Sequence, residues 1–171
     1  MIISKLSGGL GNQMFQYALG RRLALKNNVP LKLDTSEYNG KKLRKYDLSH
    51  FNIFENLATQ KDLRSVTFPS NKTDNAFLIK IYQRIFHLSP MQYVKEQTIN
   101  FRPEILTLRD DAYLDGYWQS EKYFSDIQDV IRKEFTVKNK PDPINESYLG
   151  EIKDCESVSV HVRRGDYVSN P

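Results

Sequence analysis

Residues 2–34 read IISKLSGGLGNQMFQYALGRRLALKNNVPLKLD and set the architecture expected for the chain. Residues 2–6 have the apolar character of a buried strand and run directly into a glycine-rich turn. Phe15, Leu19 and Leu23 then recur every four residues, which predicts a helix with one apolar face. A second strand is expected at residues 29–34. A strand, a turn, a helix and a strand of this total length form a βαβ unit, so we predict an α/β, Rossmann-like fold.

The turn between the first strand and the helix contains Gly8, Gly9 and Gly11. Glycine permits positive φ angles and lets a ligand approach the main chain, and the start of a helix offers unpaired amides with a partial positive charge. Asn12 is expected to cap the helix. Met14 stands where the dinucleotide fingerprint has its third glycine, and the phosphate-loop motif is absent. The turn alone therefore fits a ligand site and a tight structural turn about equally well.

Further elements are expected along the rest of the chain. They are an amphipathic surface helix at residues 75–88, a strand at 112–118 in which Gly116 marks a bulge or a close backbone approach, and a helix at 125–135 capped by Ser125.

Residues 136–147 contain two prolines among polar residues, which is the composition of a linker. We therefore expect an N-terminal Rossmann-like domain at residues 1–137, a linker with a short helix at 138–154, and the start of a second domain at 155–171.

A last strand is expected at residues 157–162, and it leads into the motif HVRRGDY at 161–167. Arg163 and Arg164 would then lie at the carboxyl end of that strand, where the ligands of open α/β sheets bind. An arginine there can direct two donors to a phosphate and never loses its charge. Asp166 is placed to hold one of the arginines. The same residues also fit a solvated turn with a local ion pair.

The composition argues against several classes of protein. The chain has 171 residues, which suits one domain or slightly more, and its 25 basic and 21 acidic residues are scattered rather than gathered on one face as in a nucleic-acid-binding protein. Cys155 is the single cysteine, so neither an internal disulfide nor a cysteine zinc site is expected. No stretch has the pattern of a signal peptide or the length of a membrane span.

Three stretches taken together resemble the α-1,2-fucosyltransferases of glycosyltransferase family 11. They are GGLGNQMFQYA near the N-terminus, YLDGYWQSEKYF at residues 113–124 and HVRRGDY. The resemblance implies two Rossmann-like halves that face each other across a cleft, the GT-B arrangement. It also implies inverting transfer of fucose from GDP-fucose to a hydroxyl of a galactoside, without a metal ion or other cofactor.

The resemblance also implies roles for individual residues. Arg163 matches the arginine tied most closely to the diphosphate, so we expect it to stabilise the leaving group. The other residues expected in the donor site are His161, Arg164, Asp166, Gly9, Gly11, Asn12 and Gln13. No Asp-x-Asp metal motif occurs, and fixed arginines and helix amides can stabilise the same developing charge.

The general base is not identified from the sequence. Its candidates, chosen because they follow predicted strand ends, are Asp34, Asp115 and Glu121.

The expected partners are GDP-fucose and a galactoside-terminated glycan, without nucleic acid. The expected location is cytoplasmic, with peripheral association at the inner face of a membrane left open. Because members of the family continue well past HVRRGDY, the chain is expected to be cut short. The alternatives are an inactive remnant of the family that binds glycans weakly, and a small basic nucleic-acid-binding module.

Overall fold

The computed structural model describes residues 1–40, 44–64, 66 and 91–162. The helix predicted at residues 75–88 lies outside the described residues. The chain divides into two compact units, residues 1–138 and 139–171, and each is described by itself.

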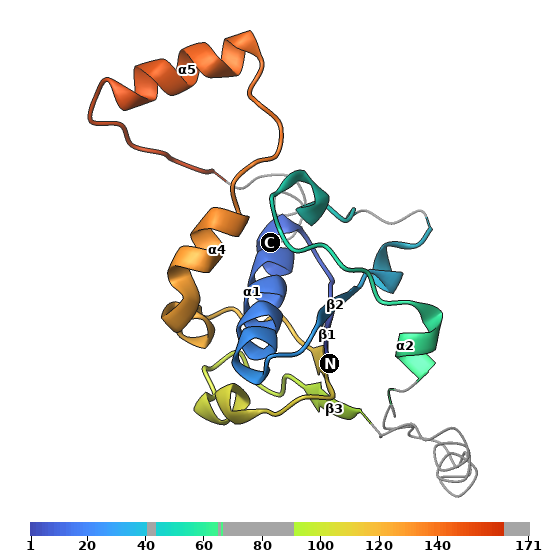
Figure 1. The fold of residues 1–171 in the computed structure, drawn as a ribbon. Helices are drawn as coiled ribbons and strands as arrows, with labels where there is room; N and C mark the ends of the chain where they lie inside the picture. The colour runs from blue at the N-terminus through green and yellow to red at the C-terminus, as the bar shows by residue number, and fades with distance from the viewer. Residues whose placement is uncertain (41–43, 65, 67–90, 163–171) are drawn as a thin grey trace, which may run out of the picture. The chain divides into compact units, whose positions relative to one another are not determined.

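The first unit is built on a parallel four-stranded sheet with the strand order β2-β1-β4-β3 (Figure 1). The strands are β1 (Ile2–Lys5), β2 (Leu31–Asp34), β3 (Gln92–Lys95) and β4 (Ala112–Asp115). The predicted βαβ unit is confirmed, with β1 and β2 parallel neighbours. The strand predicted at residues 112–118 is shorter, because the chain leaves the sheet after Asp115 and Trp118 takes a positive φ of 55°.

Helix α1 (Leu10–Asn27) packs on one face of this sheet and ends at Asn28, which takes the left-handed conformation. The prediction that Asn12 caps the helix is wrong. The N-cap is Gly9, without a side-chain hydrogen bond, because the helix begins before Asn12. Gly20 brings the helix close to the sheet, since an added Cβ would lie 2.8 Å from Leu31 Cδ1.

The first unit also contains shorter helices. They are α2 (Gln60–Arg64), α4 (Gln128–Glu134) and the 3₁₀ turns η1 (Ser36–Tyr38), η2 (Leu48–His50), η3 (Pro103–Thr107), η4 (Glu121–Tyr123) and η5 (Ser125–Ile127). The predicted helix at 125–135 therefore starts as a 3₁₀ turn. Its predicted Ser125 cap is wrong, since neither η5 nor α4 has a side-chain cap.

The main core lies between α1 and the sheet. Its large, fully buried side chains include Ile2, Leu6, Tyr17, Leu19, Leu23, Leu31, Leu33, Leu48 and Trp118. A smaller cluster covers the opposite face with Ile3, Val66, Met91 and Tyr113. Within the described residues, no helix is long and apolar enough to cross a membrane.

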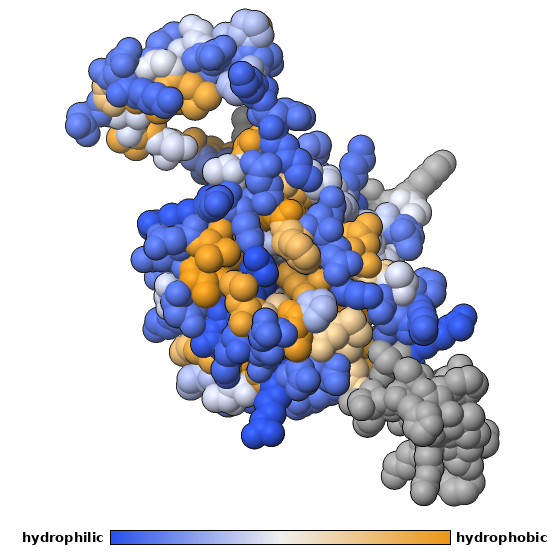
Figure 2. Space-filling view, viewed as in Figure 1, coloured by the Kyte–Doolittle hydropathy of each residue, from blue (hydrophilic) through white to orange (hydrophobic). Residues whose placement is uncertain are grey.

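The second unit contains α5 (Pro143–Lys153), whose N-cap Asp142 accepts a hydrogen bond from the Asn145 amide at 2.8 Å. Figure 2 shows apolar surface on this helix among hydrophilic side chains. The strand predicted at residues 157–162 is absent: this stretch is coil, and Val158, Val160 and Val162 are 86%, 80% and 74% exposed. An isolated strand is not stable in water, and no described strand pairs with these residues.

Candidate functional site

The carboxyl ends of the four strands meet at one edge of the sheet, at Lys5, Asp34, Lys95 and Asp115. The first connection runs from β1 to β2, while β4 and β3 lie on the other side of β1. The strand order therefore reverses beside β1, and open α/β sheets bind their ligands at such a point. The glycine turn (residues 7–11) follows β1 at this edge, and the β4 loop (residues 116–119) follows β4.

The three glycines of the turn have different environments. Gly8 has a φ of +75°, and an added Cβ would lie 2.5 Å from Asn12 Nδ2, so the turn itself requires glycine there. Around Gly9 and Gly11, an added Cβ would meet nothing within 4 Å. Gly11 is the second residue of α1 and is exposed. A purely structural turn therefore accounts for Gly8 but not for Gly11.

Gln13 supports the turn from inside. Its side chain is fully buried, and its Nε2 donates to the carbonyl oxygens of Gly8 and Lys45 at 3.2 and 2.8 Å. Its Oε1 accepts from the Asp47 amide at 2.9 Å. Both ends of this amide are thus engaged within the protein, and the place of Gln13 in the donor site stays a prediction.

Gln16 was not identified from the sequence, and it joins the two loops. Its side chain is fully buried, its Oε1 accepts from the Ser7 amide at 2.9 Å, and its Nε2 donates to the Gly116 carbonyl at 3.0 Å. A buried amide with satisfied hydrogen bonds fixes the geometry around it. Only the fold could reveal this role, since Gly116 is 100 residues away in sequence.

Asn12 is half-buried beside the turn. Its Oδ1 accepts a hydrogen bond of 2.7 Å from Nε2 of Gln119, which belongs to the β4 loop. The predicted close backbone approach at Gly116 is confirmed, because an added Cβ there would overlap the Glu96 side chain. The glycine turn and the β4 loop therefore form one continuous surface element.

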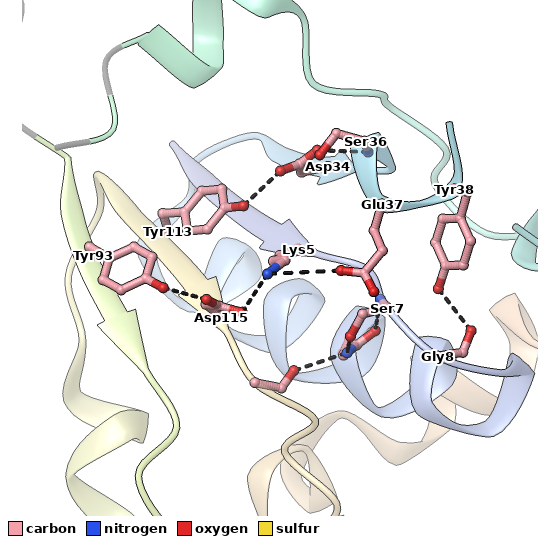
Figure 3. A network of polar contacts seen from close by, with 12 residues as sticks. Lys5, Ser7, Gly8, Asp34, Ser36, Glu37, Tyr38, Tyr93, Tyr113 and Asp115 are labelled. Carbon is pink, nitrogen blue, oxygen red and sulfur yellow. Dashed lines mark hydrogen bonds and ion pairs between the residues drawn. The ribbon is translucent and has the colours of Figure 1, made fainter. Parts of the chain in front are cut away.

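A charged network lies at the same edge of the sheet (Figure 3). Lys5 Nζ is 3.1 Å from Asp115 Oδ1 and 4.0 Å from Glu37 Oε2. Tyr93 donates its hydroxyl proton to the other oxygen of Asp115. Burial, followed by this hydrogen bond, raises the pKa of Tyr93 to about 12. The carboxylate of Asp115 is therefore held from two sides by β1 and β3.

Asp34, at the end of β2, is only 4% exposed. Its carboxylate accepts from the Tyr113 hydroxyl at 2.6 Å and from the Ser36 amide at 2.9 Å. Burial and the hydrogen bond to Asp34 raise the pKa of Tyr113. Asp34 thus uses both oxygens inside the protein, whereas Asp115 is partly exposed and Glu121 is exposed at the start of η4.

Only the first two residues of the second motif, His161 and Val162, belong to the described residues. His161 is exposed in coil, and Arg163, Arg164 and Asp166 lie outside the described residues. Within the described residues, no group of three or more His, Cys, Asp and Glu side chains is arranged to hold a metal ion.

A pocket of about 530 Å³ lies elsewhere in the first unit. It is lined by Asn52, Ile53, Phe54, Val130, Lys133, Glu134 and Thr136, none of which is a predicted site residue. Glu134 is engaged in the fold, because it accepts from Tyr17 at 2.6 Å and pairs with Arg21 at 2.9 Å.

Comparison with known proteins gives a consistent set of relatives. The family model described as glycosyl transferase family 11 matches residues 1–171. An alpha-1,2-colitosyltransferase of Escherichia coli is 32% identical over 172 residues, which cover 99% of this chain and 56% of that protein. The O-antigen biosynthesis glycosyltransferase WbnK of Escherichia coli is 30% identical over 184 residues, which cover 98% of this chain and 60% of that protein. No solved structure gives a significant match. The chain thus spans little more than half the length of these two relatives.

Proposed function

The chain belongs to glycosyl transferase family 11, and we propose that the protein containing it is an α-1,2-fucosyltransferase. It transfers fucose from GDP-fucose to a galactose hydroxyl of a glycan, with inversion at the anomeric carbon. The present chain contributes the first Rossmann-like half of a GT-B enzyme.

The observation that carries this proposal is the open glycine surface at the start of α1. Gly9 and Gly11 have free space where a side chain would be, and they lie at the carboxyl edge of a parallel sheet. Relative to alanine, glycine costs about 0.5–1 kcal/mol in the middle of a helix, and part of this cost applies at Gly11 in the first turn. No packing contact within the described residues accounts for that cost at Gly11. A substrate that lies against the backbone supplies the reason.

The chemistry of the reaction suits the residues around this surface. Cleavage of the bond between fucose and phosphate leaves additional negative charge on GDP. The amides at the start of α1 carry a partial positive charge directed at this edge of the sheet. We assign the diphosphate to Arg163, assisted by His161 and Arg164, while Asp166 holds one of the arginines in place. The fixed donors of these side chains stabilise the charge as it develops. In this proposal the enzyme needs no metal ion.

A second candidate is transfer of colitose, favoured by the similarity to the Escherichia coli alpha-1,2-colitosyltransferase. The two candidates share the family, the glycine surface and the arginine motif. They differ in the sugar that the site accepts.

The test is an assay of the protein that contains this chain, with a lactose-type acceptor and EDTA present. GDP-fucose and a nucleotide-activated colitose serve as alternative donors. We expect fucosylated product with an α-1,2 linkage and no loss of rate in EDTA. Turnover with the colitose donor alone would select the second candidate. Turnover with neither donor would support the inactive remnant.

A further inference from the structure

The side chain of Asn12 is held from two sides. Gln119 Nε2 donates to its Oδ1 at 2.7 Å. On the opposite side its Nδ2 lies over Gly8, in the space that a Cβ would otherwise fill. Gly8 therefore makes room for the nitrogen of this amide, and Gln119 binds its oxygen.

Gln119 belongs to the β4 loop, which contains features that are unfavourable in free energy. Trp118 has a φ of 55°, a conformation that is unfavourable for a large side chain. The Glu96 carboxylate binds the loop by accepting from the Tyr117 and Trp118 amides at 2.7 and 3.0 Å. The Trp118 side chain is 1% exposed, and its Nε1 has no hydrogen-bond partner within the described part of the chain.

Unfavourable backbone conformations and unsatisfied buried groups concentrate at functional sites, where the surrounding structure enforces them. Here the strained residue immediately precedes the residue that contacts Asn12. Joining the glycine turn to the β4 loop does not by itself require the strained backbone at Trp118, because Gln16 already joins these two loops through the Gly116 carbonyl.

The contact with Gln119 decides which end of the Asn12 amide is available. A primary amide has an acceptor end and a donor end. The oxygen of Asn12 is occupied by Gln119, and no described residue accepts a hydrogen bond from its Nδ2. The donor end, which lies over Gly8, is therefore the end of the amide that no described residue occupies.

We propose that Gln119 is a positioning residue that orients the Asn12 amide so that its Nδ2 donates a hydrogen bond to an oxygen of the bound nucleotide sugar. This role rests on the proposed function, because it requires the donor substrate to lie on the glycine surface. Without Gln119 the amide oxygen loses its hydrogen-bond partner, and the amide can turn its acceptor end toward the same position.

The test is a double-mutant cycle in the protein that contains this chain. Gln119→Met removes the hydrogen bond at nearly constant shape, and Asn12→Asp removes the donor while leaving an acceptor for Gln119. Gln128→Met, at an exposed position in α4, is the matched control. The kcat, the KM for GDP-fucose and the thermal midpoint are measured for each variant and for the double variant.

We expect Gln119→Met to raise the KM for GDP-fucose about tenfold, as for the loss of one oriented hydrogen bond. Its thermal midpoint should match that of Gln128→Met. Asn12→Asp should raise the KM at least as much, and the double variant should be no worse than Asn12→Asp, because Gln119 acts through Asn12. An unchanged KM in Gln119→Met, or fully additive effects, overturns the positioning role. If the unmodified protein does not bind GDP-fucose, the proposed function fails, and this role fails with it.

Discussion

Residues 2–6 and residues 157–162 are both short apolar stretches that lead into a distinctive sequence motif, but their environments are opposite. Ile2 and Ile3 are fully buried in β1, which has a parallel neighbour on each side and is covered by α1. Val158, Val160 and Val162 are exposed in coil. An apolar stretch thus indicates only that a segment can form a strand. Whether it does depends on the presence of adjacent strands with which it can pair.

The same difference separates the two halves of the proposed donor site. The glycine turn is supported entirely by residues of the first unit: Gln13 and Gln16 from inside, and Gln119 from the β4 loop. The arginine motif follows a segment of exposed coil in the second unit. The predictions below test how much each half contributes.

The largest effect is expected in the second half, at Arg163. Arg163→Ala should lower turnover about a hundredfold, equivalent to about 3 kcal/mol of lost transition-state stabilisation, because the contact strengthens as charge develops on GDP. Arg163→Lys should restore little, since lysine keeps the charge but not the paired donors. The measurement is kcat at saturating acceptor in the protein that contains this chain.

The control for this comparison is Arg132→Ala, at an exposed arginine of α4. Near-normal turnover and donor affinity in Arg163→Ala would show that HVRRGDY is a structural turn, and the donor site would then belong to the first unit alone.

A smaller effect, on stability, is expected at the glycine turn. Gly8→Ser should lower the free energy of unfolding by about 2 kcal/mol, because a side chain at this positive φ is strained and would overlap Asn12. Gly9→Ser is the matched control, since Gly9 has a φ of −82° with open space around it. The measurement is urea denaturation of both variants. Equal stability of the two would contradict the geometry of the turn.

A third prediction concerns alkaline pH at the charged edge of the sheet. The pKa of Tyr93 is raised from 10.0 to about 12 in the folded protein, so its contribution to stability is complete below pH 10. Between pH 10 and 12 the unfolded chain binds fewer protons at this group than the folded one, and stability falls as the pH rises. Tyr93→Phe should flatten the decline of the free energy of unfolding across this window. An identical slope in the variant would show that Tyr93 and Asp115 are not coupled.

The parts of the fold that follow from local pattern could be predicted. The spacing of Phe15, Leu19 and Leu23 indicated α1, and the glycine turn between two apolar stretches indicated the βαβ unit. The parts that depend on distant residues could not. The four residues of β3 carry too weak a pattern to be recognised. The strand at 157–162 was predicted from alternating apolar residues, and no strand in the described part of the chain pairs with it.

In the candidate site, too, features with a local sequence pattern could be predicted and features that depend on distant residues could not. The glycines could be identified from the sequence because glycine has a distinct conformational range. The supporting contacts of Gln16 and Gln119 could not, because they join positions 100 and 107 residues apart, and amide side chains carry no local signature of such a role. Both predicted caps, at Asn12 and Ser125, were wrong because capping depends on the residue at which the helix begins, and sequence locates that residue poorly.

The most direct test of the central claim, that the glycine turn is a substrate surface, is Gly11→Ala measured for stability and for GDP-fucose binding in the same protein. Gly11 is exposed in α1 with nothing within 4 Å of an added Cβ. The variant should gain about 0.5 kcal/mol in the free energy of unfolding, since alanine favours the helix and restricts the unfolded chain. We predict that the stabilised variant binds GDP-fucose at least tenfold more weakly, because the added methyl group lies where the substrate meets the backbone. A variant that is more stable and binds GDP-fucose as tightly as the parent would contradict it.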